Sequence, residues 1–142
     1  MNEKLITFFK EKKWWFDDAA ESYGELLSTI GIAQNSLPWM FYVHVEDGPS
    51  FLSDKGEIYQ LGWHAENTNY VANSNNLKSA LGLSDALIPL DAFAGGSGFF
   101  YNKETESVVY LEMGQILDSY KKGDVAVSWP DFDSFLEWYF GR

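Results

Sequence analysis

Hydrophobic positions near the N-terminus recur with a helical spacing. Between residues 5 and 16 they fall every three to four positions, which is the stripe of an amphipathic helix. A second stripe over residues 19–30 predicts a second helix. Asp17 or Asp18 can accept hydrogen bonds from the free amides of its first turn, and Gly31 can end it in a left-handed conformation. The chain is therefore expected to begin with two helices.

The next hydrophobic run, residues 36–48, permits two interpretations. Ser36 can cap a helix, and Pro38 suits the first turn of that helix. The same segment also alternates, with a large apolar residue at every second position: Trp39, Phe41, Val43 and Val45. Alternation of β-branched and aromatic residues is typical of a strand. On the residues alone, both a helix and a strand remain open.

Strand-like segments follow the turn at residues 47–49. Residues 51–52 and 57–62 flank the turn sequence Asp54-Lys55-Gly56 and predict a β-hairpin. The Asn-rich residues 66–76 are expected to form a polar loop.

Turns, strands and helices alternate in the C-terminal half. Ser74 can cap a short helix that stops at Gly82. Residues 98–101 and 107–111 predict two further strands, and residues 131–140 predict a final helix whose apolar side chains share one face. A length of 142 residues without a linker or an internal repeat predicts a single domain.

Composition limits where the protein works and what it binds. The chain contains no cysteine, which excludes disulfides, thiolate zinc sites and cysteine nucleophiles. Charged residues interrupt the N-terminal segment, and no stretch approaches the about 20 apolar residues of a membrane span, so we expect a cytoplasmic protein. The formal net charge of -11 argues against binding to nucleic acid or to an anionic membrane, because both require basic surfaces.

The negative charge is unevenly distributed along the sequence. From Trp14 to Asp54 there are seven acidic residues and no Lys or Arg. Such a run can simply keep a protein soluble, or it can form a docking face for a cationic partner, whose association a negative field accelerates. For a docking face, we predict that the partner-binding charge comes from these residues: Asp17, Asp18, Glu21, Glu46 and Asp47.

Two His-x-Glu pairs suggest metal chemistry. In His44-Val45-Glu46 and His64-Ala65-Glu66, residues two apart would share one face of a strand and could offer a nitrogen and an oxygen to a metal. If the two pairs met in space, they would complete a four-ligand site, and a small metal-dependent enzyme is therefore one alternative function. The Pro-Cys-x-x-Cys that accompanies His-x-Glu in nucleobase deaminases is absent.

The glycine-rich segment Gly95-Gly96-Ser97-Gly98 predicts a tight turn before a strand. It matches neither a nucleophile loop nor a dinucleotide-binding or P-loop motif. With no other catalytic pattern in the sequence, we expect no enzymatic activity, no cofactor and no metal. The protein is expected to act by binding.

Several short motifs together resemble the SUKH superfamily, a group of bacterial immunity proteins related to a fungal regulator of cell-wall synthesis. The motifs are Leu37-Pro38 followed by Gly48, the segment from Ile88-Pro89-Leu90 to Gly98, residues 108–111, and Val125 to Trp129 followed by Phe132, Phe135 and Leu136. In this family the Leu-Pro pair usually opens a helix, so the resemblance favours a helix for residues 36–48. The chain departs from the family pattern at Asp47-Gly48-Pro49, at Trp129, where Phe is usual, and at the inserted Pro130.

The resemblance implies an α+β fold with a central, mostly antiparallel sheet covered by helices. The resemblance covers roughly residues 31–140. Together with the two helices predicted before it, we expect one domain over residues 1–142, with N-terminal helices over 1–31, a sheet-containing body over 32–127 and a C-terminal helix over 128–142. The resemblance also implies a non-catalytic protein that neutralises a cognate toxin, often a nuclease, by direct binding. An acidic surface suits that role, because a nuclease presents a cationic face to its substrate. An intracellular regulatory or scaffold protein of the same fold is an alternative.

Overall fold

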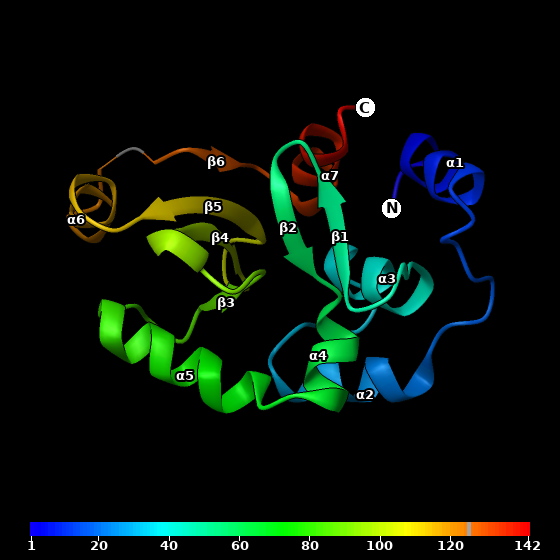
Figure 1. Cartoon of the computed structure of the whole chain (residues 1–142), viewed down its shortest axis with the longest axis horizontal. Helices are drawn as coiled ribbons and strands as arrows, with labels where there is room; N and C mark the ends of the chain where they lie inside the picture. The colour runs from blue at the N-terminus through cyan, green and yellow to red at the C-terminus, as the bar shows by residue number, and fades with distance from the viewer. Residues whose placement is uncertain (125) are drawn as a thin grey trace.

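In a computed structural model that describes residues 1–124 and 126–142, the chain forms seven α-helices, six strands and a short 3-10 helix (Figure 1). The α-helices are α1 Glu3–Glu11, α2 Glu21–Thr29, α3 Leu37–His44, α4 Leu61–Asn67, α5 Tyr70–Leu81, α6 Gln115–Lys121 and α7 Phe132–Phe140. The strands are β1 Ser50–Ser53, β2 Gly56–Tyr59, β3 Leu87–Pro89, β4 Ser97–Asn102, β5 Ser107–Glu112 and β6 Ser128–Trp129, and the 3-10 helix is η1 Ala94–Gly96. Val125, the first residue of one motif quoted above, lies outside the described residues.

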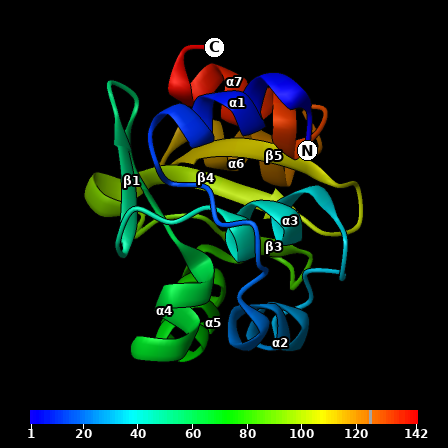
Figure 2. The same ribbon diagram turned by 90° about the vertical axis from the view of Figure 1, so that its right-hand side faces the viewer.

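The strands form two antiparallel sheets. β1 and β2 form the predicted hairpin, and the larger sheet has the order β3-β4-β5-β6. Helices α1 and α7 lie on one side of the larger sheet, whereas α2, α4 and α5 lie on the other side (Figures 1 and 2). Helix α6 follows β5 and packs against it. This arrangement confirms the expected α+β single domain with an antiparallel sheet covered by helices.

The ambiguous segment after Ser36 is a helix. The Ser36 hydroxyl accepts a hydrogen bond from the Trp39 amide at 3.3 Å, and Pro38 occupies the first turn of α3. Pro38, Phe41, Tyr42 and Val43 are all buried, so α3 has neighbours on most of its circumference. A helix that is buried nearly all round carries no amphipathic period, which explains why its sequence also alternates like a strand.

Residues 66–76 do not form the predicted polar loop. They belong mainly to α4 and α5, and α5 begins at Tyr70, four residues before the predicted cap Ser74. Helix α4 is capped by the side chain of Gln60, which accepts from the Trp63 amide at 3.2 Å. Gln is not among the usual N-cap residues, so the sequence lacked a start signal for α4. The predicted stop at Gly82 is confirmed by its left-handed conformation, with a φ of 69°.

Two predicted helix boundaries are also wrong. Helix α2 starts after Ala20 and has no side-chain cap, so neither Asp17 nor Asp18 caps it. Asp17 instead accepts a hydrogen bond from the Trp15 indole at 3.0 Å. At the other end of the chain, the helix predicted over residues 131–140 is confirmed as α7, but the C-terminal helix does not start at residue 128. Residues 128–129 form β6, and the carboxylate of Asp131 caps α7 by accepting from the Ser134 amide at 2.8 Å.

Phe41 of α3 lies at the centre of an aromatic core. Its ring centroid is 5.4 Å from that of Phe9 in α1, 5.0 Å from that of Phe51 in β1 and 5.7 Å from that of Phe132 in α7. All of these side chains are fully buried. Burial of a large aromatic ring contributes roughly 1.5–3 kcal/mol, so this cluster joins α1, α3, the hairpin and α7 into one folding unit.

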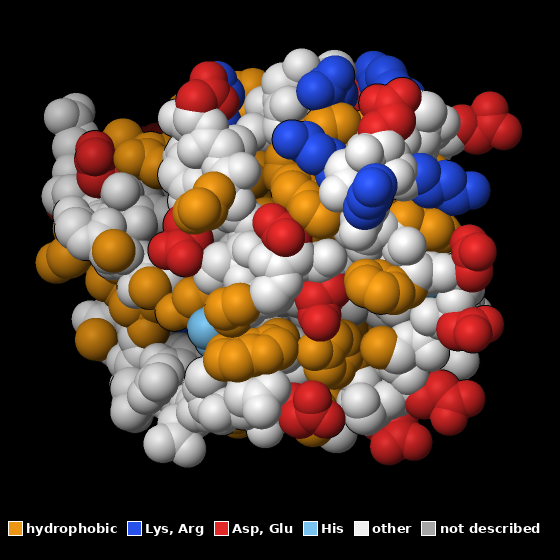
Figure 3. All heavy atoms as spheres, turned by 45° about the vertical axis from the view of Figure 1, so that its right-hand side comes forward, with side chains coloured by type: hydrophobic (Ala, Val, Ile, Leu, Met, Phe, Trp, Pro, Cys, Tyr) orange, Lys and Arg blue, Asp and Glu red, His pale blue; other side chains and the backbone are white. Residues whose placement is uncertain are grey.

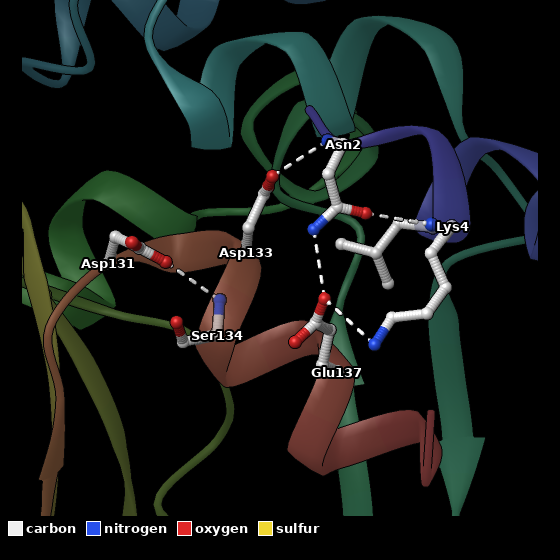
Figure 4. A network of polar contacts seen from close by, with 7 residues as sticks. Asn2, Lys4, Asp131, Asp133, Ser134 and Glu137 are labelled. Atoms are coloured by element: carbon white, nitrogen blue, oxygen red, sulfur yellow. Dashed lines mark hydrogen bonds and ion pairs between the residues drawn. The ribbon is translucent and has the colours of Figure 1, made fainter.

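Polar contacts join the first helix to the last helix (Figure 4). The Asn2 amide donates to the Asp133 carboxylate at 2.8 Å, and the Asn2 side chain donates to Glu137 at 2.9 Å. The Lys4 ammonium lies 3.3 Å from the same Glu137 carboxylate. The two ends of the chain therefore belong to the same domain.

The Tyr139 hydroxyl of α7 is buried against the hairpin, 2.9 Å from the Phe51 carbonyl oxygen and 2.6 Å from that of Gly56. We expect Tyr139→Phe to lower the free energy of unfolding by about 1–3 kcal/mol, because the buried carbonyl of Phe51 and the partly buried carbonyl of Gly56 lose their shared donor. Tyr110→Phe is the matched control: its hydroxyl makes only an exposed 3.4 Å contact, and we expect a change below about 0.5 kcal/mol. Urea denaturation would measure the free energy of unfolding of both variants. Equal losses of stability for Tyr139→Phe and Tyr110→Phe would contradict a stabilising role for the Tyr139 hydroxyl.

Candidate functional site

A groove with a volume of about 330 Å³ opens between the segment that precedes α2, the end of α3 and the helix α4. Apolar parts of Phe16, Val43 and Val45 contribute to its lining, and its carboxylates come from Asp18, Glu46 and Glu66. The described residues that line it include no Lys or Arg. Figure 3 shows the wider charge pattern: acidic side chains are spread along the side and lower edge of this face, while Lys and Arg side chains gather at the end formed by α1.

Backbone hydrogen bonds hold the two edges of the groove together. The Phe16 amide donates to the His44 carbonyl at 2.7 Å, and the Glu46 amide donates to the Trp14 carbonyl at 3.0 Å. Farther along, the Ala20 amide donates to the Val43 carbonyl at 2.9 Å. The chain between α1 and α2 is thereby fixed along the end of α3. This brings acidic residues that are almost thirty positions apart in sequence onto one surface.

Tyr23 of α2 lies where two of the carboxylates converge. Burial raises the pKa of the Tyr23 hydroxyl, and the neighbouring carboxylates of Glu46 and Glu66 raise it further. The hydroxyl therefore stays protonated and can serve as a donor to Glu46. A cation that entered the groove would meet at least two negative charges contributed by separate elements.

The structure brings some of the predicted docking residues together in this groove. Asp18 and Glu46 line it directly. Asp17 and Asp47 are exposed beside it, whereas Glu21 is exposed on α2 and borders a separate depression that includes Trp39. Residues Phe16, Tyr23 and Glu66 were not predicted as docking residues, and Glu66 was obscured because its segment was interpreted as a loop.

The two His-x-Glu pairs do not form the four-ligand arrangement. His44 donates from Nδ1 to the Phe16 carbonyl at 2.8 Å and stacks on Trp15 with ring centroids 4.8 Å apart. His64 stacks on Tyr59 at 3.7 Å and borders a different cavity. Burial lowers the pKa of His64, which favours the neutral ring. Within residues 1–124 and 126–142, no three His, Asp or Glu side chains lie together so that they could hold a metal ion.

The glycine-rich segment forms the predicted turn. Gly95 and Gly96 have positive φ angles of 69° and 83°. Gly98 is required for a different reason: a Cβ there would overlap the carboxylate of Asp91. That carboxylate accepts hydrogen bonds from the Phe93 amide at 3.0 Å and from the Phe99 amide at 3.1 Å. The segment therefore has a structural role.

Comparison of the chain with protein-family models, with curated proteins and with solved structures finds no match. Within the described part of the chain, no helix has both the length and the apolar character needed to cross a bilayer. The features that bear on function are therefore the groove, its charges and its neighbours.

Asp91 should give stability a distinctive pH dependence. Burial raises its pKa from 3.8 to about 6, although the two amide hydrogen bonds oppose the shift. Between about pH 4 and pH 6 the folded state therefore binds more protons than the unfolded state, and stability falls as the pH rises through this range. We expect Asp91→Asn to flatten this fall by up to about 2–3 kcal/mol in urea denaturation at pH 4, 5, 6 and 7.

The control for this measurement is Asp118→Asn, which removes an exposed carboxylate. The slopes of stability against pH are compared rather than absolute stabilities, because the Asp91→Asn substitution also removes one of the backbone hydrogen bonds. A slope for Asp91→Asn equal to that of the unmodified protein would contradict the assignment.

Proposed function

We propose that this chain is a non-catalytic binding protein of the SUKH immunity type, which neutralises a cationic toxin domain, such as a nuclease, by direct capture. The observation that carries the proposal is the groove beside α3, where apolar side chains are bordered by Asp18, Glu46 and Glu66 and the described lining residues include no Lys or Arg. Apolar contacts in such a groove supply affinity, and the surrounding charges select and steer a partner of opposite sign.

Phe16 is the strongest candidate for an apolar anchor. It is a large hydrophobic side chain at the edge of the groove, and 54% of its surface is exposed. Binding energy at protein interfaces is concentrated in a few large side chains, with aromatic ones prominent, that become desolvated at the centre of the contact. The acidic residues around Phe16 form the polar rim that such an anchor requires.

The separation of charge would also orient the partner. Lys4 and Lys10 belong to α1, and Lys12 and Lys13 follow it directly. Figure 3 shows Lys and Arg side chains gathered at one end of this face and acidic side chains along its side and lower edge. A cationic domain is attracted by one end of this face and repelled by the other. Electrostatic steering of this kind acts mainly on the association rate and weakens as salt concentration rises.

The first test is to identify the partner and then reverse the charge of the proposed face. Tagged protein would capture partners from a lysate of the source organism at low and high salt, and a captured toxin would be tested in a growth-rescue assay. We expect replacement of Asp17, Asp18, Glu21, Glu46 and Asp47 by Lys to weaken binding by at least about tenfold and to abolish rescue.

The control variant replaces five exposed acidic residues elsewhere by Lys: Glu104, Glu106, Glu112, Asp118 and Asp124. It changes the net charge by the same amount, so any difference between the variants reflects the position of the charge. Equal affinities for the two variants would reject this face as the binding site. Several weak partners and no rescue would instead favour a regulatory or scaffold protein.

Phe16→Ala tests the apolar part of the site separately. We expect it to increase the dissociation rate about tenfold or more, because an interface anchor is lost, while the salt dependence of association stays unchanged. Leu52→Ala is the control, since Leu52 is 70% exposed but lies in the hairpin and does not line the groove. Surface plasmon resonance measures both rates, and an unchanged dissociation rate for Phe16→Ala would remove it from the interface.

A further inference from the structure

Lys78 of α5 is a largely buried residue whose ammonium group has only a distant counter-ion. The residue is only 8% exposed, and the nearest carboxylate oxygen, on Asp85, is 3.7 Å away from Nζ. The Asp85 side chain is 95% exposed, so it remains largely in water. Within residues 1–124 and 126–142, the Lys78 ammonium donates no hydrogen bond to another group. The Nζ atom itself stays accessible, so its three donors are available to a ligand.

Lys78 lines a cavity of about 350 Å³ between the end of α2, the helix α5 and the strand β3. Helices α2 and α5 lie on the same side of the larger sheet (Figure 2). A second lysine, Lys103 from the connection between β4 and β5, borders the same cavity. Among the described residues that line it, Asp85 is the only one with a carboxylate. The cavity is therefore locally positive in a protein whose net charge is -11.

Gly31 makes room for the second ammonium group. Gly31 has a φ of 96°, and a Cβ at this position would lie 2.9 Å from Nζ of Lys103, so the lysine would have to shift its end to accept a side chain there. Two carbonyl groups near the end of α2 are already bonded: the amides of Gly31 and Ile32 donate to the carbonyls of Ser28 and Leu27 at 3.1 and 3.0 Å. The Lys103 ammonium is therefore not required as a partner for these carbonyls.

The lining of this cavity also contains uncharged polar groups, and these limit the kind of molecule that could bind there. The hydroxyl of Ser28 donates to the Gly24 carbonyl at 3.1 Å, and that of Thr29 donates to the Leu26 carbonyl at 2.6 Å. Both oxygens can still accept hydrogen bonds from ligand hydroxyl groups. Asn75 adds an amide that can donate or accept. Ammonium groups in one part of the lining and acceptor oxygens in another match a small molecule that carries both an anion and hydroxyl groups.

We propose that this cavity binds a phosphate monoester of a small hydroxylated molecule, with Lys78 and Lys103 pairing with the phosphate and Ser28, Thr29 and Asn75 contacting the hydroxyl groups. Two ammonium groups match the double negative charge of a phosphate monoester. The phosphate would take over from Asp85 as the counter-ion of Lys78, and Asp85 is free to move because it is exposed. This site is separate from the acidic groove, so it does not depend on the function proposed above.

The experiment is calorimetric titration of the full-length protein with glucose 6-phosphate, inorganic phosphate and glucose, together with amide NMR spectra of the same titrations. We expect saturable binding of the sugar phosphate with a Kd at or below about 1 mM, weaker binding of inorganic phosphate, and none of glucose. The shifted amides should belong to Ser28, Gly31, Ser74, Asn75 and their neighbours.

Lys78→Met and Lys103→Met should each weaken sugar-phosphate binding at least about tenfold, because each removes a charge-assisted contact. Lys122→Met, which changes an exposed lysine outside the cavity, should leave binding unchanged. Circular dichroism checks that the variants are folded. If Lys78→Met does not fold, Lys103→Met alone still tests the proposal, because Lys103 is exposed and its replacement should not disturb folding.

Absence of saturable binding for both phosphates at about 10 mM would overturn the proposal, as would binding that both variants retain. Equal affinity for inorganic phosphate and the sugar phosphate would overturn the assigned contacts to hydroxyl groups. Shifted amides confined to residues 3–13, which hold four of the other seven lysines, would indicate non-specific attraction and would also overturn it.

Discussion

The buried side chain of Gln60 fixes the geometry on which the groove depends. It is fully buried, and its amide nitrogen donates to the carbonyls of Tyr42 and Val45, each at 2.8 Å. These carbonyls lie at the end of α3, where a helix leaves its last acceptors without partners. The oxygen of the same side chain caps α4 through Trp63. One residue therefore sets the end of α3 and the start of α4, and with them the positions of two groove carboxylates.

Local signals in the sequence predicted most elements, and tertiary contacts decided the rest. For α3 the cap at Ser36 and Pro38 pointed to a helix and the alternation in the same segment pointed to a strand, so the residues alone left both open, and burial on most sides explains why the alternation was misleading. Helix α4 could not be predicted, because its cap is a Gln that is held in place by the distant carbonyls of α3. For the same reason the charge pattern indicated Asp18 and Glu46 as candidate docking residues but could not join Glu66 to them.

Net charge conceals two opposite local environments. The net charge of -11 leads one to expect an acidic surface, which the groove has. It also leads one to expect that every part of the surface repels anions, which does not hold for the cavity beside β3. At physiological salt, charges are screened over about 8 Å, so the field inside a small cavity is set mainly by the groups that line it. In the cavity beside β3 the charged groups are Lys78 and Lys103 against one carboxylate, that of Asp85, whereas around the groove they are carboxylates. Only the three-dimensional structure shows which charged residues line the groove and which line the cavity.

Helix α2 borders both the acidic groove and the cavity beside β3, and it packs closely against its neighbours. Gly24 of α2 accepts a hydrogen bond from the Trp39 indole at 3.3 Å, and a Cβ on Gly24 would lie 2.9 Å from that ring. On the other side, Gly62 of α4 is in direct contact with Tyr23, and any side chain at Gly62 would overlap its ring. The two glycines thus let α3 and α4 approach α2 closely. A site built on such closely packed helices loses little conformational entropy when it binds, so more of the contact energy is available as affinity.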